Sequence, residues 1–147
     1  MARSKFAMFL YFFALALTLA FAVTYLTKSE FMPYHAQALA TDWKSLSEPE
    51  QVMFLGFMRV IGALALALTV LSVWVIFSAY RKGETWAFWA IPVTGNIAGI
   101  PTIYVMFTVI TQTSGEPPII LPILGLLAFN LGLIVTCQRG RKRRVTS

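Results

Sequence analysis

Cysteine, histidine and acidic residues are scarce in this chain of 147 residues, which has one cysteine (Cys137), one histidine (His35) and six aspartates and glutamates in total. A single cysteine excludes a disulfide within the chain, and no cysteine–histidine cluster has the spacing of a metal site. The sequence also lacks a recognisable nucleophile–base pair or catalytic carboxylate pair. It therefore gives no support to an enzyme activity, and we expect no metal and no other cofactor.

Charge of either sign is also low, because only 12% of the residues are charged whereas 58% are apolar. Such a composition is unsuited to a surface that faces water, so a bilayer is the expected solvent. The net charge of +6 could indicate nucleic-acid binding, but the basic residues lie at the ends of apolar segments. A nucleic-acid groove would need them spread over one face. We therefore expect membrane lipids, and not nucleic acid, as a partner.

Long apolar runs are abundant. The hydrocarbon core of a bilayer is about 30 Å thick and takes about 20 helical residues to cross. Four segments meet this length, namely residues 6–26, 52–80, 86–110 and 119–137. Ala20-Phe21-Ala22 resembles a signal-peptide cleavage site, but the apolar run before it is too long for that class. We predict one all-α membrane domain over residues 1–147, built as a four-helix bundle.

Positive charge is divided unevenly between the two sides of these spans. Nine lysines and arginines fall on the side of the two termini, and three fall on the other side. Short loops rich in lysine and arginine are retained in the cytoplasm, so both termini are predicted to be cytoplasmic. The basic tail, residues 138–147, is expected to attract anionic lipid headgroups at about 1 kcal/mol per charge.

Residues 27–51 form the only long loop, which this topology places outside. Pro33 can start a helix, and apolar residues then recur at spacings of three and four: Ala36, Leu39, Trp43 and Leu46. The spacing predicts a short helix in the outer interface of the membrane. Ser47 and Glu50 have the spacing of a capping box, so the second span should begin near Glu48.

Arg59 is the one charge that could lie just within the membrane boundary, and it is predicted to sit beneath the loop that carries Tyr34, His35 and Trp43. Its guanidinium could reach the headgroups or pair with an acidic residue, and the candidates are Asp42, Glu48 and Glu50. Alternatively, it could bind an anionic ligand or a partner's carboxylate. His35 lacks a second metal ligand, so a hydrogen-bonded role in the loop is the simpler interpretation. These four residues form our first candidate binding site.

Asn96 and Asn130 lie at matching depth near the middle of the third and fourth spans. Polar side chains in a membrane need partners, so we expect a hydrogen bond between these two amides. Pro92 and Pro101 each remove an N–H donor from the third span, which frees carbonyls and predicts a kink. The polar layer is either structural, at about 0.6–2 kcal/mol per interhelical bond, or part of a ligand pocket.

The four spans, together with Met58-Arg59-Val60-Ile61-Gly62 at the start of the second, resemble the DoxX-like small membrane proteins of bacteria. The resemblance implies location in the bacterial inner membrane and, in some members, a link to quinone or redox partners. It transfers no functional residue to this chain.

Two classes of function remain. The first is an accessory or scaffold subunit of a larger membrane complex, which binds other subunits or a second copy of itself. A face of small residues in the first span favours it, formed by Ala14, Thr18 and Ala22. The alternative is a membrane protein that binds a lipid, a quinone or another small ligand, or a small transporter protomer.

Overall fold

The computed structural model describes residues 4–145, with side chains for residues 4–138, and this part of the chain is helical without strands. Its elements are α1 (Lys5–Thr27), α2 (Pro33–Leu39), the 3-10 turn η1 (Trp43–Ser45), α3 (Glu48–Ser78), the 3-10 turn η2 (Tyr80–Lys82), α4 (Ala87–Gln112) and α5 (Ile120–Val145). Four of the helices, α1, α3, α4 and α5, are long and apolar enough to cross a membrane. The predicted all-α class is thus confirmed, as is the presence of four helices that could span a membrane. The side chains of the basic tail from Arg139 onward lie outside the described residues.

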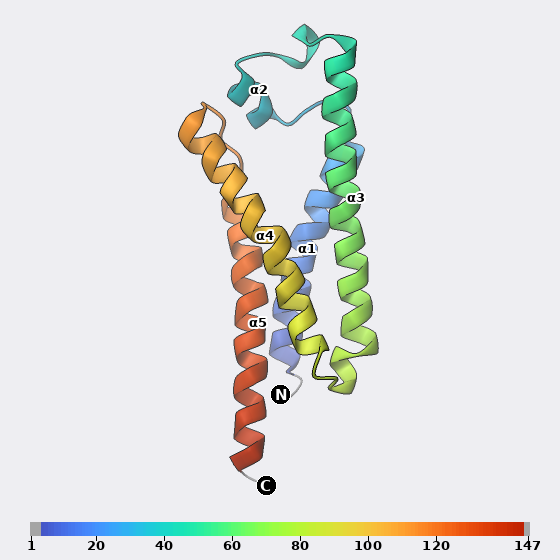
Figure 1. Cartoon of the computed structure of the whole chain (residues 1–147), viewed down its shortest axis with the longest axis vertical. Helices are drawn as coiled ribbons and strands as arrows, with labels where there is room; N and C mark the ends of the chain where they lie inside the picture. The colour runs from blue at the N-terminus through green and yellow to red at the C-terminus, as the bar shows by residue number, and fades with distance from the viewer. Residues whose placement is uncertain (1–3, 146–147) are drawn as a thin grey trace.

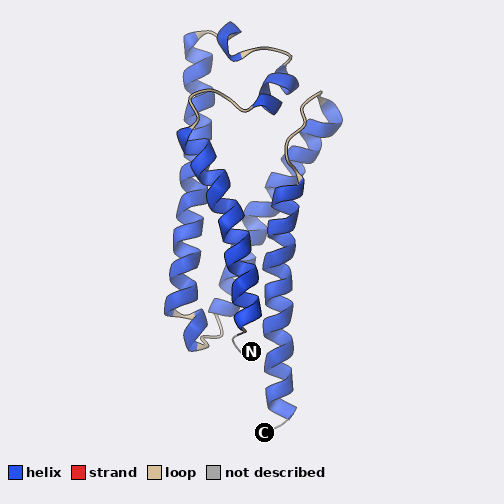
Figure 2. Cartoon of the chain, turned by 180° about the vertical axis from the view of Figure 1, so that it is seen from behind, coloured by secondary structure: helices blue, strands red, loops and turns tan. Residues whose placement is uncertain are grey.

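Among the four long helices, α1 packs against both α3 and α5. α4 packs against α5 and makes fewer contacts with α3. α4 leans away from α3 toward the end of the bundle that carries α2, while α1 runs from the side of α5 to the side of α3 (Figures 1 and 2). We call residues 28–47 the cap. The cap end of the bundle carries these residues, and the terminal end carries the start of α1 and the end of α5.

The terminal end has a core to which all four long helices contribute. Its fully or nearly buried members are Ala7, Tyr11, Ala14, Leu15, Ile76, Ala79, Tyr80, Ala87, Phe88, Ile91, Ala128 and Phe129. Three aromatic rings meet here edge to face, since Tyr80 lies 5.6 Å from Tyr11 and 5.0 Å from Phe88 between ring centroids. This core holds the four helices together at one end only.

The cap end has a second, smaller core that unites α1, α3 and the cap. Tyr25, Phe31 and Met58 are its buried members, and the partly buried ones are Phe21, Met32, Ala36, Trp43, Leu46 and Phe54. None of these residues belongs to α4 or α5. The bundle is therefore closed on all sides at the terminal end but leaves the α4–α5 pair out of the core at the cap end.

The cap is less helical than its apolar spacing predicts. α2 ends at Leu39, and Ala40 takes a left-handed conformation with φ 50° and ψ 38°. Bonds from the N–H groups of Ala40 and Thr41 back to the carbonyls of Gln37 and Ala36 complete the stop, which has the pattern of a Schellman motif. Glycine is the usual residue at this left-handed position. Because alanine occupies it here, the sequence does not predict that the helix ends at Leu39. Trp43 reaches the core from the η1 turn and not from the same helix as Ala36.

The start of α3 agrees with the sequence. Glu50 accepts hydrogen bonds from the backbone N–H of Ser47 at 2.8 Å and from its hydroxyl at 2.6 Å. α3 then runs for 31 residues from Glu48, which is about 46 Å at 1.5 Å per residue. Its first turns therefore extend beyond the thickness of a hydrocarbon core, and the cap covers Phe54 and Met58 on that extension.

The small residues of α1 serve packing within the chain. Ala14 and Ala22 are fully buried, and a Cβ built on Gly62 of α3 would lie 3.0 Å from the Ala22 carbonyl oxygen and 3.0 Å from the Tyr25 Cβ. α1 and α3 thus approach closely along this face, because glycine and alanine leave room for their backbones. Ala14 and Ala22 are therefore not accessible to another subunit, whereas Thr18 is partly exposed, and a partner at this face stays a prediction.

Candidate functional site at the cap end

His35 lies at the centre of a ring cluster on α2. Its imidazole is 4.3 Å from the Tyr34 ring, 6.2 Å from Phe31 and 6.4 Å from Tyr25 between centroids, with steep angles between the ring planes. Its Nδ1 accepts a hydrogen bond of 3.3 Å from the backbone N–H of Met32. Since an imidazole nitrogen accepts only when it carries no proton, this contact requires His35 to be neutral with its proton on Nε2. The simple hydrogen-bonded role expected of His35 is thus what the geometry shows.

Burial affects the two ionisable side chains of α2 in opposite ways. It lowers the pKa of His35, because desolvation disfavours the charged imidazolium. It raises the pKa of Tyr34, where the charged form is the phenolate, and the hydrogen bond and charge of Tyr25 act in the same direction. Tyr34 and Tyr25 bond to one another through their hydroxyls, which ties α2 to the end of α1. Both α2 residues are therefore held in their neutral forms.

Phe31 joins this cluster to α3. Its ring contacts Trp43 at 5.1 Å and Phe54 at 5.6 Å between centroids, both nearly edge to face. The side-chain amide of Gln51 in α3 donates two hydrogen bonds to the cap, to the carbonyls of Trp43 and Leu46 at 3.1 and 3.2 Å. The structure thus brings Tyr34, His35 and Trp43 together as predicted, around a phenylalanine that the sequence had not indicated.

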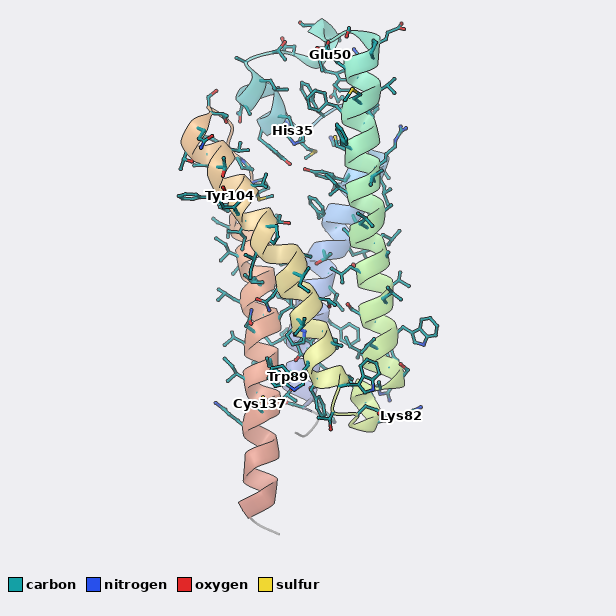
Figure 3. The ribbon with its side chains drawn as sticks, in the orientation of Figure 1. His35, Glu50, Lys82, Trp89, Tyr104 and Cys137 are labelled. Atoms are coloured by element: carbon teal, nitrogen blue, oxygen red, sulfur yellow. The ribbon has the colours of Figure 1, made fainter. Side chains whose placement is uncertain are left out.

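The opposite side of α2 contacts the turn between α4 and α5. The carbonyl of Gln37 accepts a bond of 2.7 Å from the Ser114 hydroxyl, and its side-chain Oε1 accepts one of 3.1 Å from the N–H of Glu116. Gly115 lies between them, where a Cβ would come within 2.8 Å of the Tyr34 carbonyl oxygen and 3.0 Å of the Ala38 Cβ. α2 therefore bridges the gap between the α1–α3 pair and the α4–α5 turn, and His35 lies on this bridge (Figure 3).

Arg59 stands apart from this site. It is exposed on α3, next to the buried Met58. Among residues 4–138 it forms no ion pair with Asp42, Glu48 or Glu50 and no hydrogen bond with Tyr34, His35 or Trp43. The structural ion pair that we considered for Arg59 is thus not formed, and its role as a ligand site stays a prediction.

Asn96 and Asn130 pair as the sequence predicts. Each amide N–H donates to the other's carbonyl oxygen at 3.2 Å, which makes two reciprocal bonds between α4 and α5. Each amide also donates to its own helix, Asn96 to the Pro92 carbonyl at 2.6 Å and Asn130 to the Leu126 carbonyl at 2.8 Å. Gly95 and Gly99 lie on the same interface, where an added Cβ would come within 2.5 Å of the Phe129 ring and 3.0 Å of the Leu126 side chain, respectively. The pair thus joins α4 to α5, and a ligand role for it stays a prediction.

The face of α4 that enters the core at the terminal end continues uncovered toward the cap end. Ile91 is buried, but Ala98 and Val105, which follow at intervals of seven residues and so lie on nearly the same face, are exposed. Thr94, three residues after Ile91, is exposed as well. No residue of α4 beyond Gly95 is buried. A core-facing helix surface is therefore left without a covering helix from residues 4–145.

A small polar group is buried in the terminal-end core. Tyr80 shares a hydrogen bond of 2.9 Å with the hydroxyl of Thr136, and the backbone N–H of Ser4 donates to the Tyr80 hydroxyl at 3.4 Å. Tyr11 packs against Tyr80, but its fully buried hydroxyl forms no hydrogen bond with any described residue.

Within the described residues no group of three or more histidine, cysteine or acidic side chains could hold a metal ion.

Comparison of the chain with protein-family models, with curated proteins and with solved structures finds no match. The resemblance to DoxX-like proteins therefore remains an expectation, and the site has to be interpreted from its own chemistry.

Proposed function

We propose that this chain is a multi-pass membrane protein whose cap end faces away from the cytoplasm and whose termini lie inside, in the bacterial inner membrane. The uneven distribution of lysine and arginine supports this orientation. The cap then lies at the outer interface, where its exposed Leu39 and its partly buried tyrosine, histidine and tryptophan suit the boundary between headgroups and hydrocarbon.

Within that membrane we propose that the chain acts as a non-catalytic accessory subunit, which receives a transmembrane helix of another subunit on the open side of the bundle. The observation that carries this proposal is the uncovered core-facing surface of α4 from Thr94 to Val105. The two cores support the same proposal, because α4 contributes buried residues to the core at the terminal end and none to the core at the cap end.

The side chains on this surface favour a helix over disordered lipid tails. Ala98 and Thr94 are small, and small residues allow two helix backbones to come close in a membrane. The hydroxyl of Thr94 bonds to the carbonyls of Ala90 and Ile91 in its own helix, so it adds little polarity to the surface. Small residues likewise allow α1 and α3 to approach closely where Gly62 contacts Ala22.

Site-specific photocrosslinking in native membranes tests the proposal. A benzophenone side chain at Ala98 should link to one protein of defined mass, because the position faces the open side. Ile100 is the control position, since it is also apolar, is 56% exposed and lies about 200° further round the same helix. Lipid adducts alone at both positions would overturn the subunit proposal and favour the alternative of a lipid-binding or quinone-binding protein.

A further inference from the structure

We propose that the cap is a proton-sensitive brace across the open side of the bundle, and that His35 is the residue at which a proton releases it. This inference goes beyond the proposed function and does not depend on a partner helix, because it concerns contacts within the chain.

α2 joins two parts of the bundle that otherwise separate at this end. Through His35 and Tyr34 it packs on Tyr25 and Phe31, which belong to the core shared with α1 and α3. Through Gln37 it bonds to the turn between α4 and α5. α2 has only seven residues, so these two sets of contacts lie within one or two helical turns and must move together.

The contacts of His35 require a neutral imidazole. A proton on Nδ1 would replace the bond from the Met32 N–H by two donors that face one another. His35 also occupies the first turn of α2, where the positive end of the helix dipole disfavours a cation. Protonation therefore removes the bond that fixes the start of α2 and places a charge among aromatic rings.

No neighbouring group compensates for that charge. The titratable side chains packed against His35 are Tyr25 of α1 and Tyr34 of α2, and both are neutral phenols at physiological pH. The charged residues of the surrounding elements form no ion pair with His35 among the residues whose side chains are described: Lys28, Glu30, Asp42, Lys44, Glu48, Glu50, Arg59 and Glu116. Burial of the imidazole lowers its pKa in agreement with this arrangement.

The direction of the effect follows from this shift. A histidine whose pKa is lower in the folded protein stabilises the closed cap fully above its ordinary pKa of about 6.5. That contribution falls as the pH drops below this value toward the lowered pKa. The cap is thus closed at neutral pH and is released when its side of the membrane becomes acidic.

Pulsed electron paramagnetic resonance on the full chain in lipid nanodiscs measures the release. Spin labels at Val52 of α3 and Gln112 of α4, both exposed, report the distance between the two parts that the brace joins without replacing a residue that forms it. A narrow distribution is expected at pH 8, and a longer and broader one at pH 4.5. His35→Asn is the matched variant, because its Oδ1 can accept the Met32 bond and does not titrate, and it should keep the narrow distribution at both pH values.

Nuclear magnetic resonance of the imidazole supplies a second measurement that does not depend on a variant. His35 is the only histidine, so its ring signals in labelled protein give its pKa directly, and the midpoint of the distance change should coincide with it. The proposal is overturned if the wild-type distance does not change with pH, if His35→Asn shows the same change, or if the two midpoints differ by more than one pH unit.

Discussion

The hydrogen-bonded pair of Asn96 and Asn130 allows a quantitative test of how α4 and α5 are held together. Two reciprocal bonds of 3.2 Å join the helices. Interhelical hydrogen bonds in membranes contribute on average about 0.6 kcal/mol each and at most about 1.7 kcal/mol. A double-mutant cycle with Asn96→Ala and Asn130→Ala should therefore give a coupling free energy of about 1–2 kcal/mol.

The single substitutions should each cost more than half of this value. Asn96→Ala leaves the Oδ1 of Asn130 without its partner, while the Asn130 amide still donates to the Leu126 carbonyl, so one partly buried acceptor is left unsatisfied. Thr94→Ala is the matched control on the same helix, because the Thr94 hydroxyl bonds only to carbonyls of α4. It should change the free energy of unfolding by less than about 0.5 kcal/mol.

Reversible unfolding in mixed detergent–lipid micelles, followed by circular dichroism or by steric trapping, gives the four free energies of the cycle. A coupling below about 0.3 kcal/mol would refute the reasoning, since it would mean that the amides find equal partners when the helices separate. A control variant that is destabilised as strongly as Asn96→Ala would show that the measurement reports helix propensity and not the pair.

Two further comparisons test the packing of the terminal-end core. Gly132→Ala should lower stability by about 1–3 kcal/mol, because its Cβ would lie 2.5 Å from the Tyr11 ring. Gly125→Ala should be neutral, because nothing lies within 4 Å of its Cβ. Equal changes of melting temperature in the two variants would contradict this expectation. Tyr80→Phe should cost about 1 kcal/mol through the lost bond to Thr136, while Tyr11→Phe should leave stability unchanged or raise it, because the Tyr11 hydroxyl has no partner among the described residues. A loss in Tyr11→Phe as large as in Tyr80→Phe would show that a bound water or another group satisfies that hydroxyl.

The sequence predicted the parts of the fold that depend on local chemistry. Apolar length identified the four spans, and the capping box of Ser47 and Glu50 placed the start of α3 at Glu48. The pairing of Asn96 with Asn130 followed from depth alone, because two antiparallel helices with a short connection bring residues of equal depth together.

The remaining features depend on which faces of the helices meet, and the sequence does not specify this. Ala14 and Ala22 indicated a close helix contact but not whether the second helix was internal, and α3 proved to be the neighbour. The stop of α2 at Ala40 relies on a left-handed alanine, which costs roughly 1 kcal/mol and has no sequence signal.

The candidate site was predicted in part for the same reason. Tyr34, His35 and Trp43 are close in the chain, so their proximity in space was a fair expectation. Phe31, whose ring joins them to α3, and Gln37, whose bonds reach the α4–α5 turn, could not be singled out from the many apolar and polar residues around them. Arg59 was included because it is a rare charge, but the helix turns it away from the buried Met58.

The orientation of the four spans is the central claim, since the outer cap and its exposure to external acid both depend on it. Single cysteines introduced at Thr41 in the cap, at Ser114 in the α4–α5 turn and at Gly83 after η2 can be tested in sealed cells with a membrane-impermeant thiol reagent, against a background with Cys137 replaced by serine. The account predicts rapid labelling at Thr41 and Ser114, and labelling at Gly83 only after the membrane is permeabilised. Labelling of Gly83 in intact cells, with protection of the other two positions, would contradict it.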